Sequence, residues 1–500
     1  MIKLSGRPNI LFIMTDQQRA DHLSCMGNEI LKTPNIDSIA KNGTCFRRCY
    51  CSNPMCMPNR ATIFTGKYPS IHGVRCNGIN LTPTITTITE KLANNDYYTK
   101  AIGKLHFQFY GKLYPGRYKS AESIMGWMFK KRKKNVPLPY YGFEDVDITV
   151  GHGDIVLGDY MNWLEEVAPK YAKKLLRRPE YMSRLYYETP IPEEYYSTSY
   201  IAERAINFLE QYSSGSYGNN PFFLFCSFPD PHHPVCPPGK YKEMYKPEDS
   251  ILPEDFNESG QIINHDFLGA HLDDPSRTDM FYKKIDEEDA RNFIAATYGS
   301  VAMIDDGVGK ILHNLRKLGL EENTMIIYTS DHGDLMADHG FVLKGPIHFN
   351  GVINVPLIWK LPQPNNKKNQ FTDSLVSSID IPKTILDLLG VENIRYMQGY
   401  NIDPILNNPK DKVRDYILIE DDDYEHSGKG ISTSVRTLIT EEYRLSIYRD
   451  FDDIGDLFNL NKDPREKNNL WNNQDFRPIR DKLTSKLLHK VMKVQSIELI

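Results

Sequence analysis

The chain of 500 residues contains no long hydrophobic run. No segment approaches the roughly 20 consecutive apolar residues that a membrane-spanning helix needs, so we expect no membrane association. The apolar run near the N-terminus, residues 10–14, is too short for the hydrophobic region of a secretion signal, and no small-residue cleavage site follows it. We therefore expect a soluble protein that works in the cytoplasm.

A large excess of charge of one sign is also missing. The formal net charge is −5 and 25% of the residues are charged, which is typical of an ordinary solvated surface and gives no reason to expect nucleic-acid binding. The one concentrated basic run, residues 130–134, is short, and we interpret it as a solvated loop, with an anion-attracting rim as the alternative. With 40% hydrophobic residues, the chain can bury a large core and is long enough for more than one domain.

The paired Cys-x2-Cys spacing of structural zinc sites is absent, although the chain has eight cysteines. In a chain of this size without a secretory signal, reduced thiols are expected rather than disulfides. Four closely spaced cysteines leave a zinc cluster as an alternative: Cys45, Cys49, Cys51 and Cys56. Cys56 is further compatible with a buried thiol, a metal ligand, half of a disulfide or the precursor of a more reactive group.

Short apolar runs alternate with segments of helical periodicity along most of the chain. The strand candidates are residues 9–14, 97–104, 220–228, 324–331 and 355–361, and the helix candidates are residues 34–43, 200–212 and 293–319. This alternation predicts an α/β fold with a mainly parallel central sheet flanked by helices. Residues 108–200 have few periodic stretches, and because long irregular segments are often functional, we expect this one to border the site.

The last hundred residues follow a different pattern. Short strand-like runs separated by polar turns precede residues 477–495, which have the pattern of a closing helix. We predict a smaller C-terminal antiparallel sheet with one helix packed on it. The polar segment 406–415 is the best boundary, which gives a catalytic domain of residues 1–405 and a C-terminal subdomain of residues 406–500.

Acidic residues directly follow two of the predicted strands, at the edge where open α/β sheets bind ligands. Asp16 and Gln17 follow the first strand, and Asp331 and His332 follow a later one. Carboxylate and amide oxygens suit a hard divalent cation, Ca²⁺ in the first place or Mg²⁺, and an imidazole widens the choice to Mn²⁺ or Zn²⁺. The alternative is that Asp16 and Asp331 each cap the N-terminus of a helix. Because each of these acids begins a pair of potential ligands directly after a buried strand, we favour one metal site formed by both pairs.

Cationic side chains and imidazoles are expected around this metal site. They are Arg60, Lys104, His106, His232 and Lys344. His152, in a Gly-His-Gly-Asp segment, is either a loop anchor or a substrate-binding residue. A metal surrounded by lysine, arginine and histidine predicts a site for an oxyanion ester, which leaves phosphate, phosphonate and sulfate open.

Cys56 fits this site by its position but not by its element. It lies just before Pro58, which suits the first turn of a helix, and the N-terminal end of a helix favours an anion such as a thiolate. A soft thiolate is nevertheless a poor partner for a hard, oxygen-seeking cation.

Residues 56–66, Cys-Met-Pro-Asn-Arg-Ala-Thr-Ile-Phe-Thr-Gly, closely resemble the signature of the type I sulfatases, Cys-x-Pro-x-Arg followed by Ala-x-x-x-Thr-Gly. Asn59 stands where that signature usually has Ser or Ala, which is a mild departure. Further segments that resemble motifs of this family are residues 103–106, 230–234, 330–346 and 455–470. The resemblance therefore spans nearly the whole chain.

In that family the signature cysteine is oxidised after translation by a formylglycine-generating maturase. The hydrated aldehyde supplies an oxygen both as metal ligand and as nucleophile. Because oxygen is a hard ligand, the poor match between a soft sulfur and a hard cation no longer arises. The resemblance implies a sulfatase that hydrolyses a sulfate monoester to an alcohol and inorganic sulfate. It also implies that Cys56, as formylglycine, shares one divalent metal with Asp16, Gln17, Asp331 and His332.

The resemblance implies roles for the surrounding residues as well. Lys104 and Lys344 are expected to neutralise the oxygens of the sulfate group, and His232 to protonate the leaving oxygen. Arg60 and His106 are expected to orient and hold the two hydroxyls of the hydrated aldehyde.

The pairs Asp16-Gln17 and Asp331-His332 differ from the Asp-Asp and Asp-Asn pairs of many arylsulfatases. They resemble the branch shared by choline-sulfatase-like enzymes, many bacterial carbohydrate sulfatases and the phosphonate monoester hydrolases. We predict a sulfatase for a sulfated carbohydrate or a small aryl or alkyl sulfate. A phosphonate monoester or phosphodiester hydrolase is the alternative, and a thiol-rich metal-binding or redox protein is a second one. The sequence indicates no assembly state.

Overall fold

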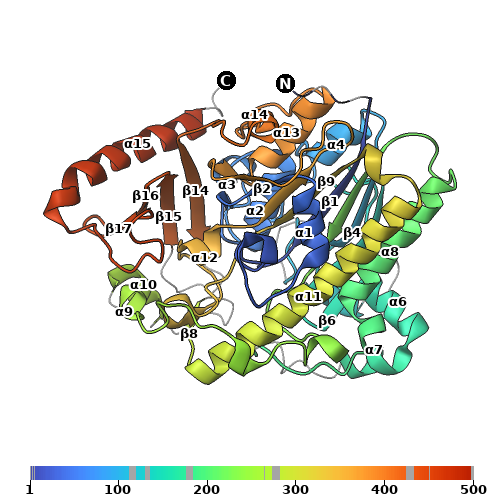
Figure 1. Cartoon of the computed structure of the whole chain (residues 1–500), viewed down its shortest axis with the longest axis horizontal. Coiled ribbons are helices and arrows are strands. Elements are labelled where there is room, and N and C mark those ends of the chain that lie inside the picture. The colour runs from blue at the N-terminus through green and yellow to red at the C-terminus, as the bar shows by residue number, and fades with distance from the viewer. Residues whose placement is uncertain are drawn as a thin grey trace.

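A nine-stranded sheet runs through the centre of the molecule in the computed structural model, with the strand order β12-β2-β11-β9-β1-β7-β4-β5-β6 (Figure 1). The structure describes residues 2, 4, 6–111, 120–129, 136–175, 184–263, 265–272, 282–423, 433–449 and 451–496. The basic run at residues 130–134 lies outside this set. Among the described helices, none is long and apolar enough to cross a membrane.

The four central strands are parallel to one another and buried along nearly their whole length. They are β9 (Thr324–Ser330), β1 (Asn9–Thr15), β7 (Phe222–Ser227) and β4 (Tyr98–Lys104). Strands covered on both faces need apolar side chains at nearly every position, which explains the continuous apolar runs in the sequence. The predicted α/β fold with a mainly parallel sheet is thus confirmed.

The register of these strands brings the candidate residues to one edge of the sheet. Thr15, the last residue of β1, pairs with Ser330, the last residue of β9, so Asp16 and Asp331 leave the sheet side by side. Gly103 of β4 pairs with Ser227 of β7 and has a φ of +105°. A Cβ atom at Gly103 would collide with the carbonyl oxygen of Ser227, so this position requires glycine.

Further strands extend the sheet on both sides. On one side lie β11 (Leu357–Lys360), β2 (Thr44–Phe46) and β12 (Gln370–Thr372), and on the other lie β5 (Asp145–His152) and β6 (Ile155–Gly158). The sequence did not predict the hairpin of β5 and β6, nor the helices α5 (Ile124–Phe129), α6 (Asp159–Val167) and α7 (Pro169–Leu175). The segment read as irregular therefore contains regular structure, and β5 ends at His152, a candidate site residue.

Helices cover both faces of the sheet (Figure 1). On one face, α8 (Ser197–Ser213) packs beside α11 (Glu287–Lys317), which also contacts α1 (Pro34–Lys41). On the other face, α2 (Cys56–Thr65) packs beside α4 (Ile88–Ala93) and α13 (Asp380–Leu389). Within α2, Phe64 contacts Phe12 of β1 and Phe225 of β7, which anchors this helix on the sheet.

The C-terminal part forms a separate four-stranded antiparallel sheet, as predicted. Its strands are β14 (Tyr416–Asp423), β15 (Thr433–Thr440), β16 (Tyr443–Tyr448) and β17 (Gly455–Asn459), and α15 (Arg477–Gln495) packs on them. Leu438 and Leu445 of this sheet share one apolar cluster with Leu483 of α15 and with Tyr68 and Ile379 of the larger part. The division of the chain between residues 405 and 406 stays a prediction.

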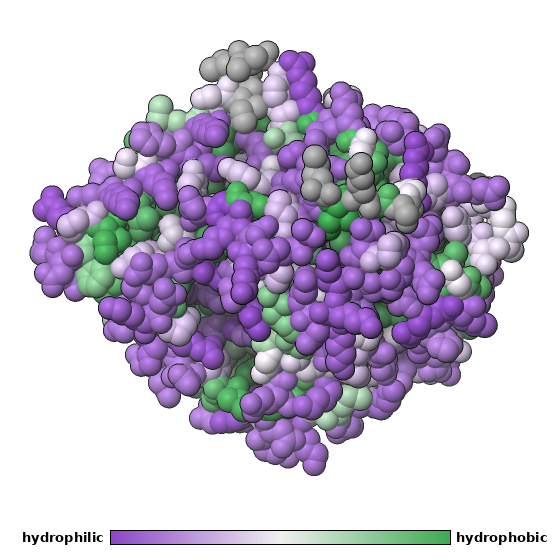
Figure 2. All heavy atoms as spheres, turned by 45° about the horizontal axis from the view of Figure 1, so that its top comes forward, coloured by the Kyte–Doolittle hydropathy of each residue, from purple (hydrophilic) through white to green (hydrophobic). Residues whose placement is uncertain are grey.

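The surface seen in Figure 2 is mostly hydrophilic, and its hydrophobic patches are small and separate. Small, separate hydrophobic patches are common on folded proteins, and those on this face do not by themselves mark a docking site.

Candidate active site

The candidate nucleophile stands at the start of a helix on the sheet. Cys56 is the first residue of α2, is 2% exposed, and follows Met55, which has extended backbone and no capping side chain. The first turn of a helix leaves backbone N–H groups without helical partners, and these favour negative charge nearby. The position is therefore suited to an anionic or electron-rich group, as the sequence indicated.

Four buried side chains bring potential metal ligands together at this point. Ligand atoms of Asp16, Cys56, Asp331 and His332 all lie within 4.8 Å of one another. The Sγ atom of Cys56 is 3.1 Å from Nε2 of His332 and 3.7 Å from Oδ1 of Asp16. No second group of this kind occurs among the described residues, so the structure gives no support to a zinc cluster of neighbouring cysteines.

Gln17 is held so that its amide oxygen faces the same place. Its Nε2 donates to Oδ2 of Asp334 at 2.5 Å and to Nδ1 of His233 at 3.0 Å. Its Oε1 accepts from Nζ of Lys344 at 2.8 Å. Because both protons of the amide are engaged, the oxygen is fixed in the orientation that a metal ligand needs. The sequence did not single out His233 or Asp334, although both lie within the segments that carry the family resemblance.

Arg60 lies between the carboxylates of Asp16 and Asp331 and contacts both. Its Nε donates to Oδ2 of Asp331 at 2.7 Å, and a terminal nitrogen lies 3.5 Å from Oδ2 of Asp16. Its other terminal nitrogen donates to the carbonyl oxygen of Lys104 at 2.8 Å and to Oγ of Ser227 at 3.0 Å. The guanidinium thus holds the acids in place; the expected contact with the hydrated aldehyde stays a prediction.

Lys104 lies against Asp16 on another side. Its Nζ forms an ion pair with Oδ2 of Asp16 and lies 2.8 Å from Nε2 of His152. Burial opposes ionisation of Asp16, but the charges of Lys104, Arg60 and Lys344 outweigh it and hold the pKa of this carboxyl well below its usual value. Asp16 is therefore a carboxylate at neutral pH, and the structure brings His152 into the site.

Lys344 contacts the candidate nucleophile directly. Its Nζ is 3.3 Å from Sγ of Cys56, 2.9 Å from Nε2 of His232 and 3.0 Å from Nε2 of His332. Burial opposes ionisation of the Cys56 thiol, but the positive charge of Lys104 and Lys344 lowers its pKa below the usual value. One ammonium group therefore links the nucleophile to two imidazoles.

Stacked aromatic rings line this cluster. His152 stacks on His232 with ring centroids 3.8 Å apart, and His232 stacks on His233 at 4.3 Å. His106 stacks on Tyr110 at 3.8 Å. Burial, with the nearby positive charges, holds the pKa values of His106, His152 and His232 well below the usual value, so these rings are neutral before substrate binds.

Asn59, the departure from the usual signature, is part of the packing beneath the site. Its Nδ2 donates to the carbonyl oxygen of Asp331, and its Oδ1 accepts from the backbone N–H of Ser52 at 3.0 Å and from Oγ of Ser378 at 2.7 Å. The larger side chain therefore satisfies three buried polar groups, and it holds the loop that carries Asp331.

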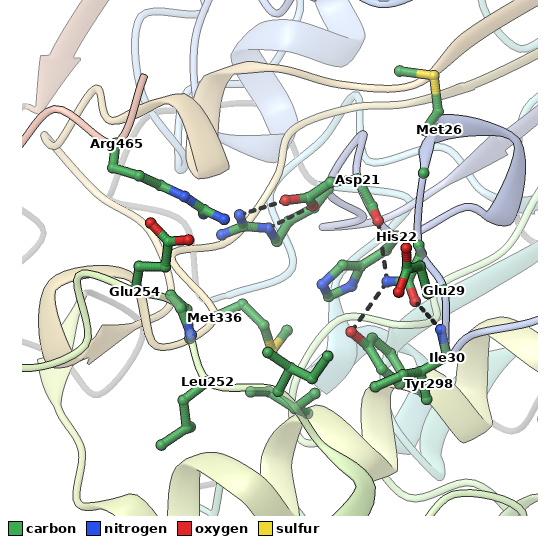
Figure 3. A pocket seen from close by; sticks show the side chains of 16 residues that line it. Asp21, His22, Met26, Glu29, Ile30, Leu252, Glu254, Tyr298, Met336 and Arg465 are labelled. Atoms are coloured by element: carbon green, nitrogen blue, oxygen red, sulfur yellow. Dashed lines mark hydrogen bonds and ion pairs between the residues drawn. The ribbon is translucent and has the colours of Figure 1, made fainter. Parts of the chain in front are cut away.

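A cavity of about 550 Å³ lies beside the loops that carry Gln17 and Asp334 (Figure 3). Figure 3 shows Asp21 and His22 across from Met336, with Arg465 at one end. None of the candidate catalytic residues lines it. The cavity is thus separate from the catalytic cluster.

Arg19, in the wall of this cavity, ties the loop after β1 to the loop after β9. It pairs with Asp21 at 2.7 Å and with Asp338 at 2.6 Å, and it donates to the carbonyl oxygens of Asp334 and Leu335. These loops carry the candidate metal ligands, so Arg19 helps to hold the ligands together.

We expect Arg19→Met to lower the free energy of unfolding by about 3 kcal/mol, because the buried Asp338 loses its closest partner and keeps the longer contact with Arg465. Arg7→Met removes an exposed ion pair with Asp96 and an exposed hydrogen bond to the carbonyl oxygen of Asn95, and should cost under about 1 kcal/mol. Urea unfolding of the two variants measures the difference. Equal midpoints would contradict a structural role for Arg19.

The parallel α/β sheet, the acids at its carboxyl edge and the lysines around a helix-borne cysteine together define a hydrolase of oxyanion esters. The pattern of the sulfatase family matches residues 8–391, and that of the N-sulphoglucosamine sulphohydrolase C-terminal region matches residues 337–493. The chain belongs to the sulfatase family, and a choline-sulfatase and a phosphonate monoester hydrolase are among the proteins similar to it.

Similar proteins support this placement. An arylsulfatase of Clostridium perfringens (strain 13 / Type A) is 30% identical, over 97% of this chain and 94% of its own. The phosphonate monoester hydrolase of Agrobacterium radiobacter has a TM-score of 0.78 at 23% identity, over 98% of this chain and 96% of its own. A protein solved with its substrate D-glucosamine-2-N,6-O-disulfate has a TM-score of 0.72 at 20% identity, over 98% of both chains.

The predicted family and enzyme class are thereby confirmed. This chain is a sulfuric ester hydrolase rather than a thiol-rich metal-binding or redox protein. The family implies a divalent metal and a formylglycine, and the cluster of Asp16, Cys56, Asp331 and His332 is the candidate site for both.

Proposed function

We propose that this enzyme removes sulfate from a sulfated carbohydrate, with formylglycine made from Cys56 as nucleophile and one Ca²⁺ ion as cofactor. One observation carries the proposal. A buried cysteine at a helix start lies among two carboxylates and an imidazole, with the Lys344 ammonium 3.3 Å from its sulfur. The neighbour solved with a disulfated glucosamine, which shares the fold, supports a sugar as the alcohol.

The residues present fit a hard cation once the sulfur is replaced. Asp16, Asp331 and Gln17 offer oxygen atoms and His332 offers Nε2, which is turned to the site because Nδ1 lies 2.9 Å from the carbonyl oxygen of Gly333. Sulfur is the one soft member of this set, and an aldehyde hydrate at Cys56 would make the set rich in oxygen. When bound, the cation supplies Lewis-acid stabilisation of negative charge.

Side chains of the protein bind the sulfate group and transfer the protons. Lys104 and Lys344 bind the non-bridging oxygens of the ester, and a hydroxyl of the hydrated aldehyde at Cys56 attacks the sulfur atom. The bond from sulfur to the alcohol oxygen breaks, and His232, neutral in the free enzyme, passes to this oxygen the proton that the attacking hydroxyl gives up. The second hydroxyl then gives its proton to the neutral ring of His106, inorganic sulfate leaves, and the aldehyde is restored. Water regenerates the hydrate for the next turnover.

A panel of substrates tests the proposal. We expect sulfate release to be fastest from sulfated monosaccharides, slower from choline sulfate and simple aryl sulfates. A phosphonate monoester or phosphodiester hydrolase is the second candidate, because the neighbour from Agrobacterium radiobacter shares the fold. Comparison of kcat/KM on an aryl sulfate, an aryl phosphonate and an aryl phosphodiester separates the two. A higher kcat/KM on the phosphonate would overturn the sulfatase assignment.

Removal of the metal tests the cofactor. Chelation should reduce activity by at least about 100-fold, because the charge on the sulfate oxygens loses its main stabilisation. Readdition of Ca²⁺ should restore it better than Mg²⁺, Mn²⁺ or Zn²⁺. A cation at 100 times its Kd should also raise the free energy of unfolding by about 2.7 kcal/mol. Unchanged stability and activity after chelation would contradict a metal site.

A formylglycine-generating maturase is the protein partner that this proposal requires. The cytoplasmic location expected from the sequence stays a prediction.

A further inference from the structure

We propose that Tyr110 contacts the substrate, and that its hydroxyl donates a hydrogen bond to an oxygen of the sulfate group. The proposal rests on the sulfatase function above and adds a residue outside the motifs that carry the family resemblance. It comes from the position of the side chain and from an unsatisfied polar atom.

The ring of Tyr110 forms part of the wall of the catalytic cluster. It stacks on His106 with centroids 3.8 Å apart and ring planes 20° apart. The ring of His152 lies 6.1 Å away, and Nζ of Lys104 lies 5.8 Å from the centroid of Tyr110. Three candidate site residues therefore surround this one side chain.

The hydroxyl of Tyr110 is buried but has no hydrogen-bond partner in the part of the chain that the structure describes. The residue is 6% exposed. Its neighbours differ, because Tyr140 donates to Glu122 at 2.8 Å and Tyr141 donates to the carbonyl oxygen of Leu81. Buried hydroxyls are normally paired, so an unpaired one beside a catalytic cluster indicates a partner that arrives with the ligand.

The missing partner must be an acceptor. Burial and the charge of Glu122 hold the pKa of Tyr110 well above its usual value, so the hydroxyl keeps its proton. The nearby side chains offer mostly donors: Lys104 is an ammonium, and the carboxylate of Asp16 is already engaged by Lys104 and Arg60. Nδ1 of His106 is likewise buried and unpartnered among the described residues.

A sulfate group is the acceptor that matches this surrounding. It brings several oxygen atoms, and its negative charge is attracted by the Lys104 ammonium beside Tyr110. A hydrogen bond to such a charged group is stronger than one to a neutral hydroxyl of the alcohol. The contact should therefore strengthen the binding of every sulfate ester and also of inorganic sulfate.

Tyr110→Phe tests the proposal, because it removes the hydroxyl and keeps the ring on His106. We expect kcat/KM for 4-nitrophenyl sulfate and for a sulfated sugar to fall by the same factor, about 10- to 100-fold. The inhibition constant of inorganic sulfate should rise by a similar factor. The thermal midpoint should stay the same or rise, because the lost hydroxyl had no protein partner.

Tyr97→Phe is the matched control. Tyr97 is 2% exposed, and its hydroxyl donates to the carbonyl oxygen of Pro8 at 3.0 Å. This variant should lose thermal stability, because the Pro8 carbonyl loses its donor, and should keep kcat/KM and the inhibition constant of sulfate. The two variants therefore give opposite patterns if Tyr110 contacts substrate.

Unchanged kcat/KM and sulfate inhibition in Tyr110→Phe would overturn the proposal. So would a loss confined to carbohydrate substrates, or a drop in thermal midpoint as large as that of Tyr97→Phe. If the wild-type protein hydrolyses no sulfate ester, the proposed function fails separately. Calorimetric binding of inorganic sulfate to the wild type and to Tyr110→Phe then still decides whether the hydroxyl contacts a sulfate oxygen.

Discussion

Replacement of Cys56 by alanine should reduce the turnover of sulfate esters by about 10⁴-fold or more while the protein remains folded. The proposed nucleophile is made from the side chain of Cys56 and cannot form without it. Lys344 and His332 contact the sulfur of this side chain directly. Loss of one small buried sulfur should change the free energy of unfolding far less than it changes activity. Steady-state kinetics and urea unfolding measure the two effects.

Two further variants sharpen this result. Cys226→Ala removes a buried thiol from β7, away from the cluster, and should keep full activity. Cys56→Ser keeps a hydroxyl but lacks the second one that would expel sulfate, so it should release one alcohol per enzyme and then stop as a sulfate ester.

Mass analysis of the tryptic peptide with Cys56 should show the aldehyde in active wild-type enzyme. An unmodified cysteine in fully active material would refute the mechanism.

The second large effect is expected from Lys344→Met, which should lower kcat/KM for sulfate esters by about 10³-fold. The ammonium group contacts Cys56, His232 and the oxygen of Gln17 at 2.8–3.3 Å, so its loss removes charge from the sulfate oxygens and disturbs the proton donor. The loss should fall mainly on kcat, because charge on the sulfate oxygens grows in the transition state. Kinetics on one aryl and one sugar sulfate measure it.

Lys360→Met is the control for the loss of a buried lysine. Lys360 pairs with Glu321 at 2.7 Å on β11, away from the cluster, and its replacement should cost stability but leave kcat unchanged. Lys344→Arg should recover little activity, because the planar guanidinium cannot take the place of a compact ammonium among three close partners. Full activity in Lys344→Met would show that this ammonium does not bind the sulfate group.

The central strands and their catalytic ends could be predicted from the sequence because burial on both faces leaves an uninterrupted apolar signal. Asp16 and Asp331 follow such strands, and parallel strands end at one edge, so their proximity followed from the chain alone. The role of Cys56 did not follow from physics alone; the signature of the family was needed to explain why a sulfur should lie beside a hard cation.

Other parts of the site depend on contacts that no local pattern encodes. Gln17 is oriented by His233 and Asp334, which lie far away in the sequence. Tyr110 stands in a segment without clear periodicity, and its stacking on His106 together with its buried hydroxyl, unpaired among the described residues, identifies it. The strands β5 and β6 were missed because they form the edge of the sheet, where side chains are less uniformly apolar.

The burial of Cys56 has a consequence for how active enzyme arises. At 2% exposure, its sulfur is out of reach of any large modifying protein once α2 has packed on the sheet. On the mechanism proposed above, conversion of Cys56 must therefore take place on the nascent or unfolded chain, before folding is complete. On the same mechanism, a copy that folds before conversion stays inactive, so the active fraction would be decided during synthesis.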